Sequence, residues 1–348
     1  MRLLTGGMIA LIGALIAVWL HTPLPWMLGP LLFVATSRMA SVPVISSAKL
    51  RYLGQWGIGI SLGLYFTPYV VGVIAQNIWP ILAGMFFAVC LGFYGTLVFR
   101  KLGGVDLKTA WFASAIGGAS EMTSLSERYG GRADLVASAH SLRILTVVVV
   151  IPIALQIWGV VGTDASLPGP KVVNLGGLVI LAALTASSAL IAGFLKMPNG
   201  WVLGPMFVAM GLTMAGIELS ALPDFVSKTG QLLIGWSLGD KFRPGFFRVA
   251  PRFLLSVVFC SISSIFLAFC FALLLDQTTS IPLATLLLGL APGGIAEMAI
   301  TAKVLQLGVP LVTAFQVTRM ALVVIITGPM FKLFILKHCK DQIVLHKL

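Results

Sequence analysis

Charged residues are scarce in this sequence. Only 10% of its 348 residues are Asp, Glu, Lys or Arg, whereas 58% are hydrophobic and the mean hydropathy is +1.03. A water-soluble domain carries about 25% charged residues, so this composition excludes a water-soluble domain. Apolar runs of roughly 17–25 residues, enough to cross a bilayer, recur along the chain. They are continuous rather than alternating, which predicts an all-α polytopic membrane protein and not a β-barrel.

Histidine and cysteine are also scarce. There are four of each, and neither type shows the spacing of a metal cluster or of a disulfide framework. A copper oxidase needs clustered imidazoles, and none are paired within the apolar runs. We therefore expect no metal, no cofactor and no enzymatic activity. The residues are His21, His140, His338 and His346, with Cys90, Cys260, Cys270 and Cys339.

Acidic residues are fewer than basic ones, at 11 against 23, which gives a net charge of +12. The basic residues lie in short loops beside apolar runs, where lysine and arginine set the orientation of membrane helices. No helix-turn-helix, zinc-finger or arginine-rich module stands outside these runs. The expected surroundings are membrane lipid and not nucleic acid.

The chain contains an internal duplication. The segments "SAIGGASEMTS" (114–124) and "LAPGGIAEMAI" (290–300) are offset by 176 residues. Nearly the same shift aligns "WMLGP" (26–30) with "WVLGP" (201–205), and "GQWGIGISLG" (54–63) with "GQLLIGWSLG" (230–239). We predict a first membrane repeat at 1–158, a linker at 159–173, and a second repeat at 174–348 that ends in a short basic tail.

Each repeat contains five candidate membrane spans. In the first they are 3–20, 24–39, 52–66, 70–98 and 133–156, and in the second 174–195, 199–216, 225–240, 253–275 and 309–331. The two glycine–glutamate segments lie at 110–130 and 284–306. If both cross the membrane, the basic loop 240–252 faces outside, against the positive-inside rule. If both are re-entrant, the repeats are inverted and the basic loops face the cytoplasm, as do both termini. A broken helix that crosses remains the alternative.

Two glycines followed by a glutamate, deep in an apolar chain, indicate a binding site. Irregular backbone survives at membrane depth only against protein or a water-filled cavity. The residues after such a turn begin a half-helix, whose free N–H groups favour anions. Two such turns from inverted repeats would meet near the midplane, as in secondary transporters. The candidate substrate- and ion-binding residues are Gly117, Gly118, Glu121, His140, Arg143, Gly293, Gly294, Glu297, Gln316 and Arg319.

Each glutamate is followed, 22 residues later, by an arginine inside an apolar run: Arg143 after Glu121, and Arg319 after Glu297. We expect each pair to neutralise its own charges, because a lone charge at the bilayer centre costs on the order of 2.5–3.5 kcal/mol. The pair either only holds the turn in place or also lines a solute path. His140 and Gln316 lie three residues before the arginines, where each either forms an interhelical hydrogen bond or contacts a ligand.

With these features in view, the sequence resembles the AbrB-duplication membrane family over essentially its whole length. Gly117, Gly118, Glu121 and Arg143 match Gly293, Gly294, Glu297 and Arg319 in the paired motif. Members are named as ammonia monooxygenases or as AbrB family transcriptional regulators. The architecture is similar to that of inverted-repeat cation–anion transporters with re-entrant or broken helices. The resemblance therefore implies a transporter, without a substrate.

The sequence thus predicts a secondary transporter in the bacterial inner membrane. Its solute would be small and polar or ionic, with a proton or cation as candidate coupling ion, and alternating access would move one repeat against the other. The alternative is a membrane signalling, regulatory or scaffold protein that affects gene expression indirectly and whose duplicated charges are purely structural. The oligomeric state is open.

Overall fold

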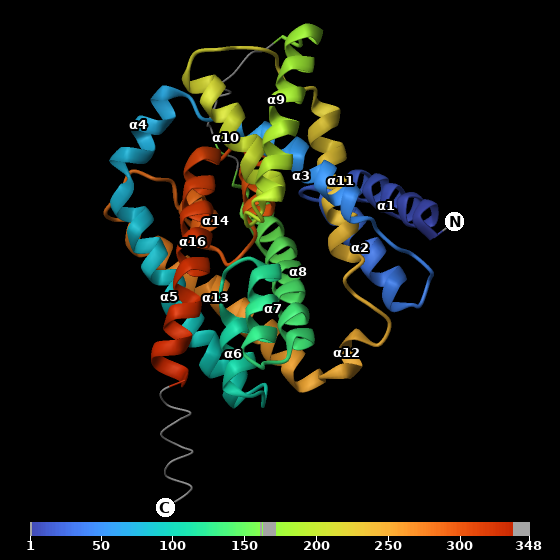
Figure 1. The fold of residues 1–348 in the computed structure, drawn as a ribbon, viewed down its shortest axis with the longest axis vertical. Helices are drawn as coiled ribbons and strands as arrows, with labels where there is room; N and C mark the ends of the chain where they lie inside the picture. The colour runs from blue at the N-terminus through green and yellow to red at the C-terminus, as the bar shows by residue number, and fades with distance from the viewer. Residues whose placement is uncertain (1, 161, 163–171, 337–348) are drawn as a thin grey trace, which may run out of the picture.

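The computed structural model describes residues 2–160, 162 and 172–336, and within them it is entirely helical (Figure 1). Most of the predicted linker and the tail from 337 lie outside the described residues. The first half contains α1 (Arg2–Trp19), α2 (Pro25–Met39), α3 (Ala48–Gly63), α4 (Pro68–Gln76), α5 (Ile78–Lys101), α6 (Leu107–Ser114), α7 (Ala119–Arg128) and α8 (Ala133–Ile157). The second contains α9 (Leu175–Phe194), α10 (Gly200–Met214), α11 (Asp224–Gly239), α12 (Phe246–Val249), α13 (Pro251–Asp276), α14 (Leu283–Leu290), α15 (Ile295–Val304) and α16 (Val309–Met330), followed by a π-helical turn, Phe331–Leu336.

Six helices of the described chain are long and apolar enough to cross a membrane: α1, α5, α8, α9, α13 and α16. Their outer faces carry large apolar side chains, and Trp19, Phe86, Ile157 and Phe194 are between 71% and 88% exposed. Water-soluble proteins rarely expose apolar surface of this extent. The composition and the structure agree on a polytopic membrane protein.

One predicted span is wrong in its bounds. We expected a single crossing over 70–98, but residues 68–76 form the separate helix α4, which is followed by Asn77 as its C-terminal cap. Thr67 caps α4 by accepting a hydrogen bond from the N–H of Val70, and Pro68 occupies the first helical position. The axes of α3 and α4 differ by 85°. The start and stop signals of α4 were hidden in a continuously apolar stretch.

The two halves present the same helices in the same order, with α1–α8 corresponding to α9–α16. The correspondence extends to unusual backbone. Leu24 and Asn199, which precede α2 and α10, both adopt the left-handed conformation, and so do His21 and Lys196 three residues earlier. Non-glycine residues rarely take this conformation, so its recurrence marks a structural repeat.

Corresponding helices run antiparallel where they touch. Helices α3 and α11 meet at Gly54 and Gly230, and farther along α3 Gly57 faces Val226, which lies earlier in α11. Helix α5 packs antiparallel on α13 in the same way, because Phe87 stacks on Phe271 while Phe99 contacts Phe253. The second half is therefore inverted relative to the first.

Helices of each half also pack against helices of the other half. Helix α3 packs on α10, and its counterpart α11 packs on α2. The carbonyl of Val202 lies against Gly59, and the carbonyl of Met27 lies against Gly235, so closely that a Cβ at either glycine would overlap it. Here glycine permits close contact between backbones.

Each glycine–glutamate segment folds as a hairpin. In the first half, the N–H of Arg132, just after α7, donates to the Oγ1 of Thr109 at the start of α6, at 2.9 Å. In the second, the N–H of Gly308 donates to the Oγ1 of Thr285 at 3.4 Å. The end of the second half-helix thus returns to the start of the first, and the structure decides for re-entrant segments over broken crossing helices.

Candidate functional site

The second glycine of each motif leaves space for the glutamate. Gly118 and Gly294 are the residues directly before α7 and α15, and Glu121 and Glu297 occupy the third helical position. A Cβ at either glycine would overlap the Oε2 of the glutamate three residues on. From the third position a carboxylate reaches back over the free N–H groups of the helix start. Each half-helix therefore carries its own anion at its positive end.

The first glycine leaves space for the methionine that ends the motif. A Cβ at Gly117 would lie 3.0 Å from the Cε of Met122, and one at Gly293 would lie 2.7 Å from the Cγ of Met298. Both methionines are fully buried. None of the four motif glycines has a positive φ, so they are needed for space and not for a left-handed turn. Every fixed residue of GG-x-x-E-M now has a structural reason.

Arg319 does not pair with Glu297. Its Nη1 donates to the carbonyl of Ala291 at 2.5 Å, and its Nη2 donates to the carbonyl of Gly293 at 2.7 Å and to the Oε1 of Gln316 at 2.6 Å. Gln316 in turn donates to the carbonyls at the end of α14. The arginine thus satisfies carbonyls that the end of a helix leaves open, where positive charge is favoured.

Arg143 has the same task in the first half. Its Nη1 donates to the carbonyls of Ser114 and Ala115, each at 3.3 Å, and its Nη2 lies 2.9 Å from the Nδ1 of His140. The Nε2 of His140 lies 3.0 Å from the carbonyl of Phe112, which can only accept, so the histidine proton is on Nε2.

The expected mutual neutralisation of glutamate and arginine is therefore wrong. The described residues contain two ion pairs, Arg38–Asp240 and Arg132–Asp134, and neither involves the motif. The reason is the helix dipole: each arginine is held at the negative end of one half-helix and each glutamate at the positive end of the next.

Both turns face one cavity of about 100 Å³ between the two halves. Seven of the ten predicted site residues line it: Gly117, Gly118, Glu121, Arg143, Gly293, Gly294 and Glu297. The other three, His140, Gln316 and Arg319, lie behind the turns and hold their carbonyls. The roles of all ten in binding stay predictions.

Sequence reasoning missed two cations and an amide in the wall of this cavity: Arg51 near the start of α3, Lys241 just after α11, and Asn199 before α10. From the sequence, Arg51 and Lys241 were interpreted only as residues that set the orientation of the membrane helices. Their repeat counterparts are Ser227 and Tyr65, so the duplication does not mark them as a pair. Burial, with Arg51 nearby, lowers the pKa of Lys241 to about 8, although Glu297 acts to raise it.

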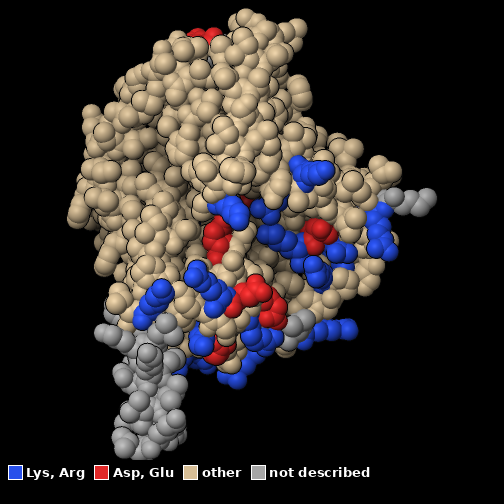
Figure 2. Space-filling view, viewed as in Figure 1, with Lys and Arg blue, Asp and Glu red and all other residues tan. Residues whose placement is uncertain are grey.

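The cavity adjoins a much larger vestibule of about 1000 Å³, with which it shares the wall residues Arg51, Ala119, Ser120 and Lys241. Basic side chains of the vestibule come from α2, α3 and the segment after α11, whereas α7 and α8 contribute hydroxyls and acids. Figure 2 shows charged side chains around a hollow near the centre of this face and across its lower half, while the upper half is almost free of them. The vestibule is therefore on the basic side of the molecule.

The family model described as "Transition state regulatory protein AbrB" matches residues 26–335. The chain belongs to the AbrB family. It is 27% identical over 334 residues to "Uncharacterized protein YhjN" of Bacillus subtilis (strain 168), covering 88% of this chain and 86% of that protein. It is 25% identical over 350 residues to "Putative regulator AbrB" of Escherichia coli (strain K12), covering 96% and 97%.

The description of the family model names a regulatory protein and no enzymatic activity. Within the described ranges, the structure places no three His, Cys, Asp or Glu side chains where they could hold a metal ion together. Of the two relatives, one is named as a regulator and the other has a name that gives no activity.

This AbrB-family chain is closed on one side of the cavity and open on the other. Helix α15 of the second half packs on α3 of the first, and the Nζ of Lys303 donates to the Oγ of Ser61 at 2.6 Å. The repeat-equivalent pair is Glu127 of the first half and Ser237 of the second, and both residues line the vestibule. Helices α7 and α11, whose residues are all described, do not pack on each other as α15 packs on α3. The two halves thus share a fold and differ in how the hairpin meets the partner half.

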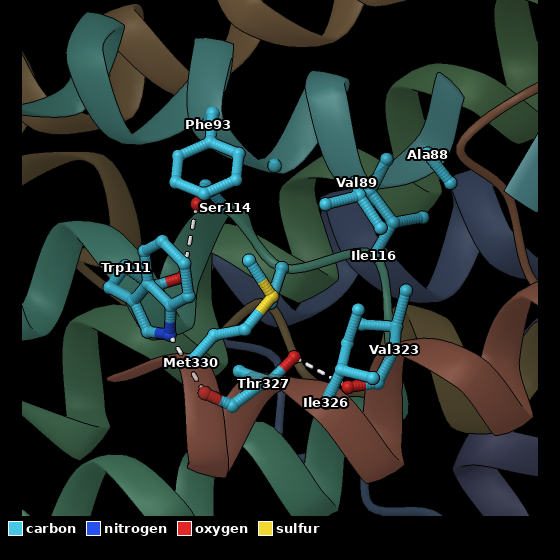
Figure 3. Close-up of a pocket in the computed structure, with 12 residues that line it drawn as sticks. Ala88, Val89, Phe93, Trp111, Ser114, Ile116, Val323, Ile326, Thr327 and Met330 are labelled. Carbon is cyan, nitrogen blue, oxygen red and sulfur yellow. Dashed lines mark hydrogen bonds between the residues drawn. The ribbon is translucent and has the colours of Figure 1, made fainter. Parts of the chain in front are cut away.

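The first turn has a second, apolar side. Its residues Ala115 and Ile116 line a small crevice of about 30 Å³ between α5, α6 and α16, which Figure 3 shows with Phe93, Val323 and Met330 around it. The indole of Trp111 donates to the carbonyl of Thr327 there, at 3.3 Å. No charged side chain lines this crevice, so the charged groups of the turn are on its cavity side.

Proposed function

We propose that this protein is a secondary transporter of a small polar or ionic solute in the bacterial inner membrane. The observation that carries the proposal is the cavity in which the starts of two half-helices, one from each inverted half, face each other. Transporters built from inverted repeats bind their solutes at such interfaces between discontinuous helices. Both termini would lie in the cytoplasm, because the basic vestibule would face that side.

The one-sided opening of the cavity supports alternating access. The vestibule provides a path from the basic side, and the contact of Lys303 with Ser61 closes the opposite side. Because the halves are inverted copies, exchanging their conformations would close the vestibule and open the other side. The same polypeptide would then present the cavity alternately to the two faces of the membrane.

The name of the Escherichia coli relative favours a second candidate, a membrane protein with a regulatory role. A transporter changes the cytoplasmic concentration of its solute, and gene expression that responds to that solute changes in turn. A dedicated signalling or scaffold protein would instead move no solute. Flux through the purified protein distinguishes these two functions.

The test uses a cysteine-free background in proteoliposomes and a panel of solutes of each charge. Ser120 lies in the wall of both the vestibule and the cavity, and we expect a charged thiol reagent to block flux through Ser120→Cys. The matched control Ser280→Cys lies in an exposed loop and lines neither the cavity nor the vestibule, so its flux should survive the reagent. If folded protein moves none of the solutes above the level of empty liposomes, the transporter proposal is wrong and the regulatory function is favoured.

A further inference from the structure

Each half-helix start in the cavity is already occupied by a carboxylate of the protein itself. Glu121 and Glu297 fold back over Gly118 and Gly294, at the positive ends of α7 and α15. A solute anion that used either start would have to take the place of that glutamate. The glutamate therefore also indicates which chemistry fits there, namely a carboxylate.

The charges around Glu297 favour an anionic solute over a cationic one. Four cations face the turn from the elements around it, while helix α14 carries no titratable side chain. A metal cation would be repelled by these charges and by two helix starts, whereas an anion would be attracted. The surrounding charged groups are Arg51 of α3, Arg143 of α8, Arg319 of α16, Lys241 after α11, and the acid Glu121 of α7.

No other side chain of the described residues holds Glu297, whose carboxylate contacts only the backbone at the start of its own helix. It is 9% exposed, and the described residues give its carboxylate no hydrogen bond or ion pair with another side chain. Structural glutamates at this depth are normally paired, because a buried charge without a partner is costly. A nine-tenths buried carboxylate that faces a cavity and has no side-chain partner can rotate away when a ligand takes its place on the helix start.

We propose, building on the transporter function, that the solute is a small carboxylate anion which displaces Glu297 from the start of α15, and that the displaced glutamate takes up one proton. Two ionised carboxylates in one small site repel each other, so one of them binds a proton. That proton comes from water in the vestibule and forms an O–H bond on Glu297, and no other bond changes. Each anion then crosses with one proton.

This assignment makes the proton the coupling ion and gives Glu297 a defined task. The anion can occupy the cavity at low cost only together with the proton, so a proton gradient drives its accumulation. Without the anion, the ionised Glu297 keeps its place on the N–H groups of α15. Glu121, which is less buried than Glu297, is not assigned this role.

The first experiment measures binding and proton uptake together on the purified full chain. Lactate, succinate and glutamate are the carboxylate probes, with sodium and potassium ions and inorganic sulfate for comparison, at a pH below 8 so that Lys241 keeps its charge. We expect a carboxylate to bind with uptake of one proton from a weakly buffered solution. Binding without proton uptake, or binding of only sulfate or only the cations, contradicts the proposal. This readout needs only the wild-type protein.

The second experiment uses Glu297→Gln, with Glu218→Gln in an exposed loop as the matched control. Glutamine has nearly the same shape and cannot take up the proton. In proteoliposomes the variant should still exchange the carboxylate found above for labelled carboxylate, but a pH gradient should no longer drive accumulation, and the control should do both. Loss of exchange together with coupling means that Glu297 holds the solute directly, and it overturns the displacement.

The two levels of failure can be told apart. If a neutral or cationic solute moves through the protein and carboxylates do not, the anion proposal is wrong and the transporter function stands. If no solute of any charge moves, the transporter function is wrong as well.

Discussion

At the scale of single residues, the repeated motif is a packing solution for two side chains that the turn must hold. The first glycine admits a buried methionine, and the second admits the carboxylate that covers the next helix start. The two glycines of each pair are adjacent in sequence, yet they serve different neighbours. Substitutions should separate the two tasks.

Gly294→Ala should therefore impair transport, whereas Gly293→Ala should lower the stability of the fold. The new Cβ at 294 meets the mobile end of Glu297, so the chain should fold with nearly unchanged thermal stability and lose coupled transport, because the carboxylate is pushed off the helix start. At 293 the Cβ meets the fully buried Met298, and overpacking of this kind costs about 1–3 kcal/mol. Thermal unfolding in detergent, measured beside flux, checks this. Equal losses of stability in both variants would contradict the division of tasks.

The sequence alone identified the residues of the motif and not their partners. The duplication marked both glutamates and both arginines, because they recur at one spacing. It could not show that each arginine binds backbone carbonyls, since those partners have no side-chain signature. Arg51 and Lys241 were missed as site residues because only one half carries each of them.

At the scale of helices, the hairpins are the elements that meet or leave the opposite half. Threonines Thr109 and Thr285 close the base of each hairpin, so α6 with α7, and α14 with α15, are each tied together as a unit. Six of the ten predicted spans coincide with helices that are long and apolar enough to cross a membrane, whereas α2, α3, α10 and α11 have only 15 or 16 residues each. Helix α4 was not predicted, because its ends are polar caps inside an apolar stretch.

Movement of the hairpins can be tested by cross-linking. In a cysteine-free background, Ser61→Cys with Lys303→Cys should react with a short bifunctional thiol reagent in the conformation described here, since the two wild-type side chains are hydrogen bonded. The repeat-equivalent pair, Ser237→Cys with Glu127→Cys, should react only when the vestibule closes during transport. Cross-linking of the second pair should leave the vestibule inaccessible to thiol reagents. If both pairs react equally well in the resting protein, the exchange of conformations is wrong.

At the scale of the whole molecule, two inverted halves interlock through α2, α3, α10 and α11, and each contributes one hairpin to a shared cavity. The inversion was predictable because only inverted repeats place the basic loop 240–252 on the cytoplasmic side. The difference between the two sides of the cavity was not predictable, since a duplicated sequence gives no sign of which conformation each half adopts.

The inverted arrangement is tested most directly by labelling two repeat-equivalent positions in intact cells. Leu102, after α5, and Thr278, after α13, are both exposed and are 176 residues apart. A membrane-impermeant thiol reagent added outside should label Thr278→Cys and not Leu102→Cys, and permeabilised cells should show labelling of both. Labelling of both positions from the same side of an intact membrane would contradict the inversion on which the site and its proposed function depend.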